Sequence, residues 1–236
     1  VAISEGSKQF LESLFLWDGI KKNAEPIKTI KVFDRNSSNK ILFENIDAEN
    51  KLGYVVENAD LGAVLNARLK SALAIDFFSP AEIKQVVPKK ECVHLHVTYN
   101  EKSYPVEAKL VVLADGGRST ICQQLGIQQF QKDYKQHAII ANVSLEKPHQ
   151  NIAFERFTET GPFAMLPLRK FNDQNRCSLV CVVDEKESKE MMGRIEKPLL
   201  ANLQERFGNR LGKIIHVGKR HDFPLKLSIA KEQVRP

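Results

Sequence analysis

A short apolar run that ends in a carboxylate and two glycines, residues 110–119 (LVVLADGGRS), constrains the fold of this chain more than any other segment. The continuous apolar part predicts a strand covered on both faces, as in a parallel sheet flanked by helices. After such a strand, Asp115 would face the crevice in which doubly wound sheets bind ligands. Gly116 and Gly117 permit close backbone approach, and Ser119 suits the start of a helix that attracts anions. The segment therefore fits a nucleotide, although an Asp-Gly turn before a helix also occurs for purely structural reasons.

The rest of the sequence mixes helical patterns with many short strand patterns. Apolar residues recur at helical spacing over residues 4–20, with Ser4 as a cap, and again over 57–73. Two β-type runs, 27–35 and 40–46, are separated by Asn-Ser-Ser-Asn, which predicts a hairpin. Further helices are expected over 187–208, and further strands at 81–87, 92–99, 137–145, 151–158, 163–168, 177–183, 213–220 and 225–230. The predicted fold is α+β with an α/β part: a mostly antiparallel sheet with flanking helices, beside one buried strand.

Composition excludes several classes of protein. Hydrophobic residues make up 42% of the 236 residues and charged residues 27%, which is typical of a globular domain and not of a disordered, collagen-like or coiled-coil chain. No apolar run approaches the roughly 20 residues that a membrane span requires, and the first residues do not resemble a signal peptide. Because the chain begins with Val1 in what reads as the middle of a domain, we expect an internal fragment of a cytoplasmic protein.

The net charge of +6 is confined to one end of the chain. Residues 186–236 carry 12 basic and 6 acidic side chains, whereas residues 1–185 carry 23 of each. The basic residues are scattered and form no block, so they favour a solvated face over a nucleic-acid site, with contact to an anionic membrane surface as the alternative. The candidates for that contact are Arg206, Arg210, Lys213, Lys219 and Arg220.

Cysteines and histidines give no prediction of a metal site. The four cysteines contain no CxxC pair, which predicts reduced thiols. Cys177 and Cys181 share a face of one predicted strand at a spacing too wide for an easy disulfide, so we expect both to be buried. His94 and His96 also share a strand face, but the sequence shows no third ligand nearby.

The segment 110–119 resembles the Asp-Gly motif of the class A flavoprotein aromatic hydroxylases, a family with the pattern A-D-G-x-x-S. Residues 137–168 and 210–227 resemble the ubiquinone-biosynthesis branch of that family, nearest to the 2-polyprenyl-6-methoxyphenol hydroxylases. The resemblance covers essentially the whole chain. Its most specific parts are ADGGRS, IANV, AFERFTETGPFAMLP and RLGKI.

The sequence also departs from the family pattern. It contains no GxGxxG loop for the FAD pyrophosphate, and no Gly-Asp or Gly-Asn segment follows Phe223–Leu225. Cys122 stands where broader relatives carry arginine, so a phosphate or NADPH contact is not expected there. The resemblance implies an incomplete, Rossmann-like FAD-binding domain, a substrate-binding sheet and a set of connecting strands. The FAD-binding domain is expected at 1–26, 57–75 and 108–130. The substrate-binding sheet is expected at 27–56 and 131–228, and the connecting strands at 76–107.

The resemblance implies an FAD-dependent monooxygenase that hydroxylates a polyprenylated phenol in ubiquinone biosynthesis, with NAD(P)H as electron source. No catalytic side chain is expected, because the flavin carries the chemistry. Cofactor contacts are expected at Asp115, Gly116, Gly117, Ser119, Glu57 and Asn58. The substrate pocket is expected at Phe154, Arg156, Phe163, Met165 and Pro167. A plain helix cap at Glu57 and Asn58, and a plain core at the pocket positions, are the alternatives.

Two main interpretations of the function remain, beside a third in which the protein is a related flavoprotein, such as a reductase or halogenase, that shares the Asp-Gly motif and would be distinguished by its product. In the first, the chain is part of the monooxygenase and is inactive by itself, and other ubiquinone-biosynthesis proteins or the inner face of the cytoplasmic membrane deliver the substrate. In the second, the chain is a non-catalytic module of a biosynthetic complex that binds a lipid or a partner protein. Flavin content separates the two.

Overall fold

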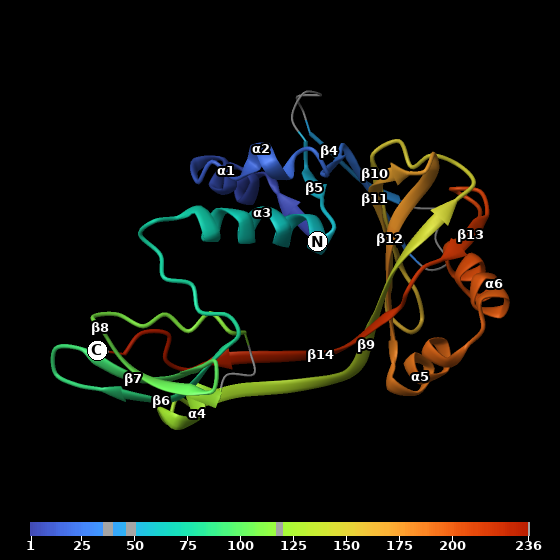
Figure 1. Cartoon of the computed structure of the whole chain (residues 1–236). Coiled ribbons are helices and arrows are strands. Elements are labelled where there is room, and N and C mark those ends of the chain that lie inside the picture. The colour runs from blue at the N-terminus through green and yellow to red at the C-terminus, as the bar shows by residue number, and fades with distance from the viewer. Residues whose placement is uncertain (35–39, 46–50, 117–119, 236) are drawn as a thin grey trace. The chain divides into compact units, whose positions relative to one another are not determined.

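The computed structural model describes all residues except 35–39, 46–50, 117–119 and 236 (Figure 1). The chain forms two compact units. One contains Val1–Ser71 and Lys135–Leu225, and the other contains Ala72–Tyr134 and Lys226–Pro236. No helix among the described residues is long and apolar enough to cross a membrane.

The first unit is built on a large sheet, which confirms the predicted mixture of helices with a predominant, mostly antiparallel sheet. Its strands follow the order β13 (Ile214–Val217), β9 (Gln129–Leu145), β12 (Gln174–Asp184), β11 (Pro162–Phe171), β10 (Ile152–Phe157), β3 (Thr29–Phe33) and β4 (Lys40–Glu44). Strand β14 (His221–Ala230) also pairs with β9. Neighbours in this order pair antiparallel, except that β3 and β10 are parallel. The predicted hairpin is confirmed as β3 and β4, while its turn lies outside the described residues.

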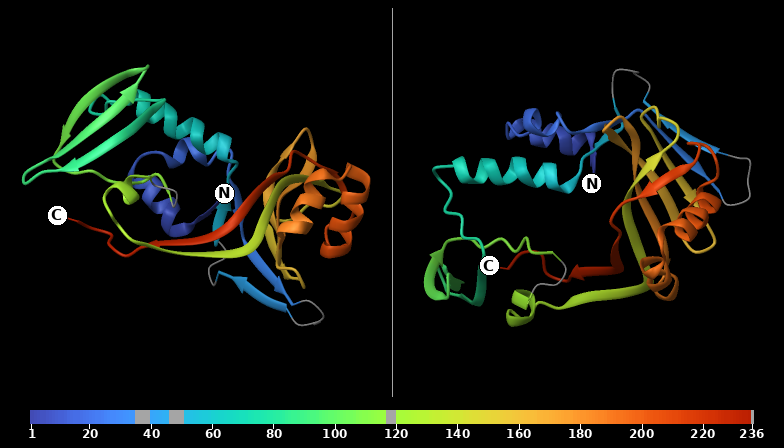
Figure 2. Two further views of the ribbon diagram at one scale, coloured as in Figure 1. Left: turned by 90° about the horizontal axis from the view of Figure 1, so that it is seen from below. Right: turned by 45° about the vertical axis from the view of Figure 1, so that its right-hand side comes forward.

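Helices α5 (Glu185–Gly193) and α6 (Glu196–Phe207) cover one face of this sheet (Figure 2). Helix α6 ends at Phe207 and is capped by Gly208, whose φ of 82° suits glycine. On α6 the Phe207 ring lies 5.9 Å from the ring of Phe163 on β11. Each large apolar side chain buried in this way stabilises the fold by about 1.5–3 kcal/mol. The sheet and the two helices therefore share one core.

A smaller sheet and three helices complete the first unit. The strands follow the order β1 (Ala2–Ser4), β5 (Gly53–Val55) and β2 (Glu25–Ile27), and the helices are α1 (Glu5–Ser13), α2 (Trp17–Ile20) and α3 (Asn58–Ser71). β1 and β5 approach so closely that a Cβ atom on Gly53 would lie 2.5 Å from the carbonyl oxygen of Ile3, so this position requires glycine. On α3, Leu61 and Val64 pack on the local core, whereas Leu65 is exposed, and Leu73 lies beyond the end of the helix. Only part of the predicted apolar face is therefore buried.

The prediction of one helix over residues 4–20 is wrong, because α1 and α2 are separate. Ser4 caps α1 as predicted, since its hydroxyl accepts a hydrogen bond from the Ser7 N–H at 3.2 Å. Phe15 then adopts a φ of 57° and ends the helical run. This break allows Leu16 and Trp17 to join the core.

The second unit contains a three-stranded antiparallel sheet and one short helix. The strands are β6 (Ala81–Pro88), β7 (Val93–Tyr99) and β8 (Lys102–Ala108), and the helix is α4 (Thr120–Gln124). The turn between β7 and β8 uses Asn100 and Glu101, with φ values of 50° and 63°, which is the geometry of a tight two-residue hairpin.

The predicted buried strand at residues 110–114 is absent from the structure. These residues form neither a helix nor a strand, and Leu110 and Val112 are 78% and 76% exposed. Val111 and Leu113 alternate with them and pack on the core of the second unit. A strand needs a neighbour for its N–H and C=O groups. No strand in the described part of the chain pairs with this segment, so it covers a core on one side only.

The buried cysteines agree with the sequence prediction. Cys177 and Cys181 are free thiols in β12, and both lie in the core beneath the helices. Burial raises the pKa of Cys177 to about 12 and that of Cys181 to about 11. Both side chains therefore act as small apolar groups at neutral pH.

Candidate functional site

The Asp-Gly turn lies in the second unit, directly after residues 110–114. Asp115 is exposed, and Gly116 has a φ of 80°, in the left-handed region that favours glycine. Its chain neighbours aside, no residue that the structure describes places an atom within 4 Å of the position that a Cβ on Gly116 would occupy, so the described surroundings leave room for a ligand. Gly117 and Ser119 lie outside the described residues.

Apolar anchors on both sides hold this turn. Before it, Val111 and Leu113 pack on a core that contains Val86 and Leu95, and after it Ile121 of α4 enters the same core. Cys122 is also buried, at 9% exposure. The segment is therefore fixed at both ends while the Asp115 carboxylate remains exposed.

Glu57 lies in the first unit, at the start of α3. Its carbonyl oxygen accepts hydrogen bonds from the N–H groups of Asp60 and Leu61, both at 3.1 Å, as at a helix N-cap. Its carboxylate accepts a hydrogen bond from Asn142 Nδ2 at 2.6 Å and pairs with Arg176 Nη2 at 2.9 Å. Asn58 is the first residue of α3. The predicted site residue Glu57 at the start of α3 therefore has a carboxylate that is already paired with Arg176 and hydrogen-bonded to Asn142.

Arg176 is itself fixed from several sides. Its Nε donates a hydrogen bond to the carbonyl oxygen of Arg169 at 3.0 Å, and its guanidinium carbon lies 5.4 Å from the centre of the Phe171 ring. Its side chain is only 15% exposed, and that of Glu57 is 34% exposed. The Glu57–Asn142–Arg176 cluster thus joins α3 to β9 and β12. It can present a fixed polar surface, but Glu57 is poorly placed to act as a free base.

The residues predicted for the substrate pocket lie mainly in the helix-covered core. Phe163 and Met165 of β11 are 1% and 0% exposed, and Pro167 on the same face is also buried. Arg156 of β10 donates a hydrogen bond to the carbonyl oxygen of Arg206 at 2.7 Å. Phe154 is 7% exposed and packs on Phe207, with ring centres 5.7 Å apart.

The opposite face of the same strands carries residues that the sequence reasoning missed. Because side chains alternate along a strand, neighbours of the buried residues point to this face. They are half-buried, and the strand register places Asn142, Ser178 and Leu166 in one row and Ile140, Val180 and Ala164 in the next. The strand alternation was visible in the sequence, but the identity of the helix-covered face was not.

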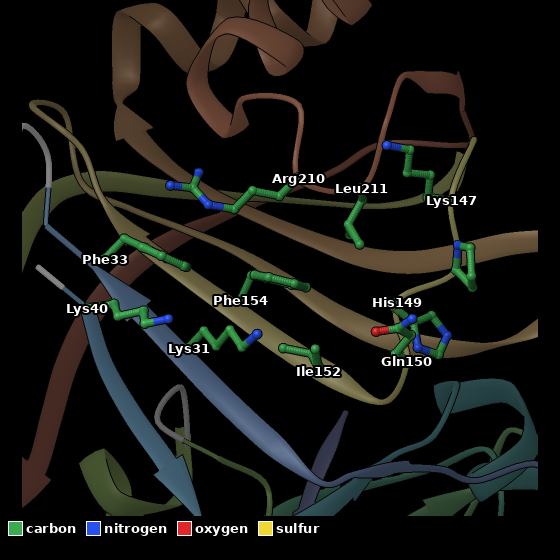
Figure 3. Close-up of a pocket in the computed structure, with 11 residues that line it drawn as sticks. Lys31, Phe33, Lys40, Lys147, His149, Gln150, Ile152, Phe154, Arg210 and Leu211 are labelled. Carbon is green, nitrogen blue, oxygen red and sulfur yellow. The ribbon is translucent and has the colours of Figure 1, made fainter. Parts of the chain in front are cut away.

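Phe154 also lines a hollow of about 490 Å³ at the edge of the large sheet (Figure 3). Its lining combines the apolar side chains Phe33, Ile152, Phe154 and Leu211 with Lys31, Lys40, Lys147 and Arg210. The buried His149 borders it as well. Its Nε2 lies 2.9 Å from the carbonyl oxygen of Leu168, and its Nδ1 accepts a hydrogen bond from the Asn151 N–H, so the ring is held from both sides.

Within the described ranges, one group of possible metal ligands is present, and it lies in the second unit. Cys92, His94 and Glu107 place ligand atoms within 4.8 Å of one another, because His94 and Glu107 are cross-strand partners. His94 and Glu107 are exposed. Desolvation, and then the charge of Glu107, raise the pKa of the Cys92 thiol, which disfavours the thiolate that a metal needs. This geometry gives little support to a metal site.

The basic residues near the C-terminus are partly engaged within the first unit. Arg206 pairs with Glu187 and donates a hydrogen bond to Thr160 Oγ1 at 3.0 Å. Arg220 donates hydrogen bonds to the carbonyl oxygens of Met191 and Arg194 at 2.8 and 2.7 Å. These two side chains therefore stabilise the fold around α5.

Comparison with known families identifies the chain. Residues 2–230 match the family described as "FAD binding domain". The chain belongs to this FAD-binding-domain family. The resemblance predicted from the Asp-Gly motif is thereby confirmed, and FAD is the cofactor of the family.

Relatives of known name refine this picture. The chain is 31% identical to ubiquinone hydroxylase UbiL of Rhodospirillum rubrum over 99% of its own length and 53% of that protein. It is 27% identical to the mitochondrial ubiquinone biosynthesis monooxygenase COQ6 of Danio rerio over 87% of its length and 43% of that protein. The chain thus spans about half the length of the curated relatives that it matches.

Solved structures show the same fold. The p-nitrophenol 4-monooxygenase PnpA of Pseudomonas putida superposes with a TM-score of 0.75 at 14% identity, covering 100% of this chain and 60% of that one. The flavin-dependent monooxygenase PieE, solved with FAD and substrate, gives a TM-score of 0.72 at 12% identity, covering 99% of this chain and 44% of that one. The fold is therefore that of flavin monooxygenases.

Proposed function

We propose that the protein is an FAD-dependent monooxygenase that hydroxylates a polyprenylated phenol in ubiquinone biosynthesis, with NAD(P)H as the electron donor. The observation that carries this proposal is the 31% identity to ubiquinone hydroxylase UbiL across 99% of the chain. The match to COQ6 points to the same pathway. The substrate class and the electron donor rest on these relatives and on the sequence resemblance.

Asp115 and Gly116 fit part of a flavin site. The exposed Asp115 carboxylate is free to accept hydrogen bonds from ribose or ribityl hydroxyl groups, and the open space beside Gly116 admits close backbone approach. Gly117 and Ser119 are proposed to extend this contact. When bound, FAD supplies the oxygen chemistry, so the side chains of this chain bind and orient rather than react.

Glu57 and Asn58 are proposed to lie near the flavin as positioning residues. Asn142 and Arg176 hold the carboxylate of Glu57 in one orientation, and the positive charge of Arg176 compensates its negative charge. A carboxylate held in this way can orient neighbouring polar groups beside the cofactor. Asn58 would contribute through the start of α3.

The half-buried face of the large sheet is proposed to form the wall of the substrate pocket. Ala164 and Leu166 offer a small apolar surface, and Asn142 offers a polar edge for a phenol hydroxyl. The predicted residues Phe154, Arg156, Phe163, Met165 and Pro167 would act indirectly, because they fix the strands from the core side. A dry wall of this kind excludes water from the reacting ring.

A product assay tests the proposal. The full-length protein, reconstituted with FAD, is supplied with NAD(P)H, oxygen-18 gas and a short-chain prenylated phenol. We expect a product that gains one labelled oxygen atom on the ring, detected by mass spectrometry. Label-free product, or no product from flavin-loaded protein, would contradict the proposed reaction.

A non-catalytic lipid- or partner-binding module is the competing function, and flavin content addresses it. A full-length protein that stays colourless after reconstitution with FAD would favour the module. Peripheral contact with the inner face of the cytoplasmic membrane, or with other ubiquinone-biosynthesis proteins, is proposed for either function, because a polyprenyl chain gains about 0.8 kcal/mol for each CH₂ that it keeps out of water.

A further inference from the structure

The hollow at the edge of the large sheet carries an unusual concentration of positive charge. Lys31, Lys40, Lys147 and Arg210 all line it, and none of its eleven lining residues is acidic. Among the described residues, no recorded ion pair includes any of these four side chains. Four cations around one hollow repel one another unless an anion joins them.

The sheet register brings these cations together. Lys31 and Phe33 lie two residues apart on one face of β3, and Lys40 of β4 is the cross-strand partner of Phe33. Figure 3 shows Arg210 and Lys147 across the hollow from Lys31 and Lys40, with Phe154 between them. Strand pairing therefore places Lys31 and Lys40 at the hollow, whereas Lys147 and Arg210 reach it from connecting segments.

Arg210 is held over the apolar floor. Its guanidinium carbon lies 4.1 Å from the centre of the Phe33 ring, and its Nη1 donates a hydrogen bond to the carbonyl oxygen of Phe207 at 3.2 Å. Burial, and then the positive charge of Arg156, lower the pKa of Arg210. The local potential is thus positive around a guanidinium that retains donors for an anion.

The floor of the hollow is apolar. Phe33, Ile152, Phe154 and Leu211 line it beneath the four cations. A free inorganic anion would use only the cations and would leave the half-buried Phe33 and Ile152 in contact with water, whereas Phe154 and Leu211 are already buried. An anionic headgroup attached to an apolar chain uses both parts of the lining.

We propose that this hollow is a binding site for the phosphate headgroup of an anionic membrane phospholipid, whose chain contacts the apolar floor. The site would hold the first unit at a lipid surface. Its cations are distinct from most of the basic residues near the C-terminus, since Arg210 is the one member common to both sets. The proposal concerns lipid binding and does not depend on flavin or on the hydroxylation reaction.

Vesicle co-sedimentation of the full-length protein tests the site. Vesicles of phosphatidylglycerol and phosphatidylcholine in equal parts are compared with vesicles of phosphatidylcholine alone. The double variant Lys31→Gln/Lys40→Gln is expected to lose about 20-fold in affinity for the mixed vesicles, because each lysine near an anionic surface contributes substantially to binding. The single variant Lys147→Gln is expected to lose affinity for the mixed vesicles as well, but by a smaller factor than the double variant.

The matched control is Lys170→Gln/Lys197→Gln, which removes the same charge from exposed positions that do not line the hollow. It is expected to lose less than about threefold. Equal losses in the two double variants would overturn the site, because they would reduce it to general charge attraction. Absence of binding by the unaltered protein would overturn it as well.

Calorimetric titration separates the lipid from free phosphate. Short-chain phosphatidylglycerol, below its micelle concentration, is expected to bind about tenfold more tightly than inorganic phosphate, and the Lys31→Gln/Lys40→Gln protein is expected to lose that binding. Equal affinity for inorganic phosphate would contradict a role for the apolar floor. Thermal unfolding of each variant verifies that the substitutions leave the fold intact.

Discussion

Glu57 and Asp115 are the two acidic residues expected at the cofactor, and they lie in opposite environments. Glu57 is half-buried, and its carboxylate is held by Asn142 and by Arg176. Asp115 is exposed at the end of a segment that packs on one side only. A carboxylate that is already bound stabilises the fold, whereas an exposed one keeps its hydrogen-bonding capacity for a ligand. The contacts therefore give Glu57 a role in the fold, and we propose that Asp115 keeps its carboxylate for the cofactor.

The largest effect is expected from Arg176→Ala. The substitution leaves the half-buried Glu57 carboxylate with one partner fewer, so the free energy of unfolding of the first unit should fall by about 2 kcal/mol. Trp17, the only tryptophan of the chain, is buried in this unit and reports its unfolding by fluorescence in urea. An unchanged urea midpoint would show that Glu57 is solvated, and the contrast with Asp115 would fail.

Asn142→Ala should have an intermediate effect. It removes the 2.6 Å hydrogen bond to Glu57 but leaves the ion pair with Arg176 in place. We expect a loss of about 1 kcal/mol in the same urea experiment. A loss as large as that of Arg176→Ala would mean that the amide, and not the guanidinium, carries most of the stabilisation.

Asp115→Ala should change the free energy of unfolding by less than about 0.5 kcal/mol, because the side chain is exposed. Urea unfolding followed by circular dichroism measures both units of the fold. A loss of 1 kcal/mol or more would identify Asp115 as a structural turn residue, which is the alternative that the Asp-Gly sequence allows.

The smallest perturbation uses the native thiols. Cys177 and Cys181 are buried and hold their protons, since burial raises their pKa values to about 12 and about 11. A thiol reagent at pH 8 should leave both unlabelled in the folded protein and label them in urea. Peptide mass spectrometry locates the label. Rapid native labelling of Cys177 would show that the core beneath the helices opens readily.

The sequence predicts features that depend on contacts between residues near one another in the chain, and it does not predict contacts between distant residues. The hairpin of β3 and β4 follows from two β-type runs around a turn sequence, and Ser4 as the cap of α1 follows from its position. The partners of Glu57 lie 85 and 119 residues away, so no local pattern indicates them.

Residues 110–114 show that an apolar run alone is not sufficient to predict a strand. Their apolar run has the composition of a buried strand, but strand formation depends on a neighbouring strand, which the run itself cannot specify. The pocket residues show the same limit, because alternation separates Phe163 and Met165 from Ala164 and Leu166 without indicating which face the helices cover.

The affinity for FAD of the full-length protein and of its Asp115→Ala variant tests the central claim most directly. Flavin fluorescence quenching gives both dissociation constants, and Asp76→Ala, at another exposed acidic residue of the second unit, is the matched control. We predict that Asp115→Ala weakens FAD binding by about tenfold, which equals about 1.4 kcal/mol, while the control binds as the unaltered protein does. Equal affinities in all three proteins would contradict the assignment of Asp115 to the cofactor.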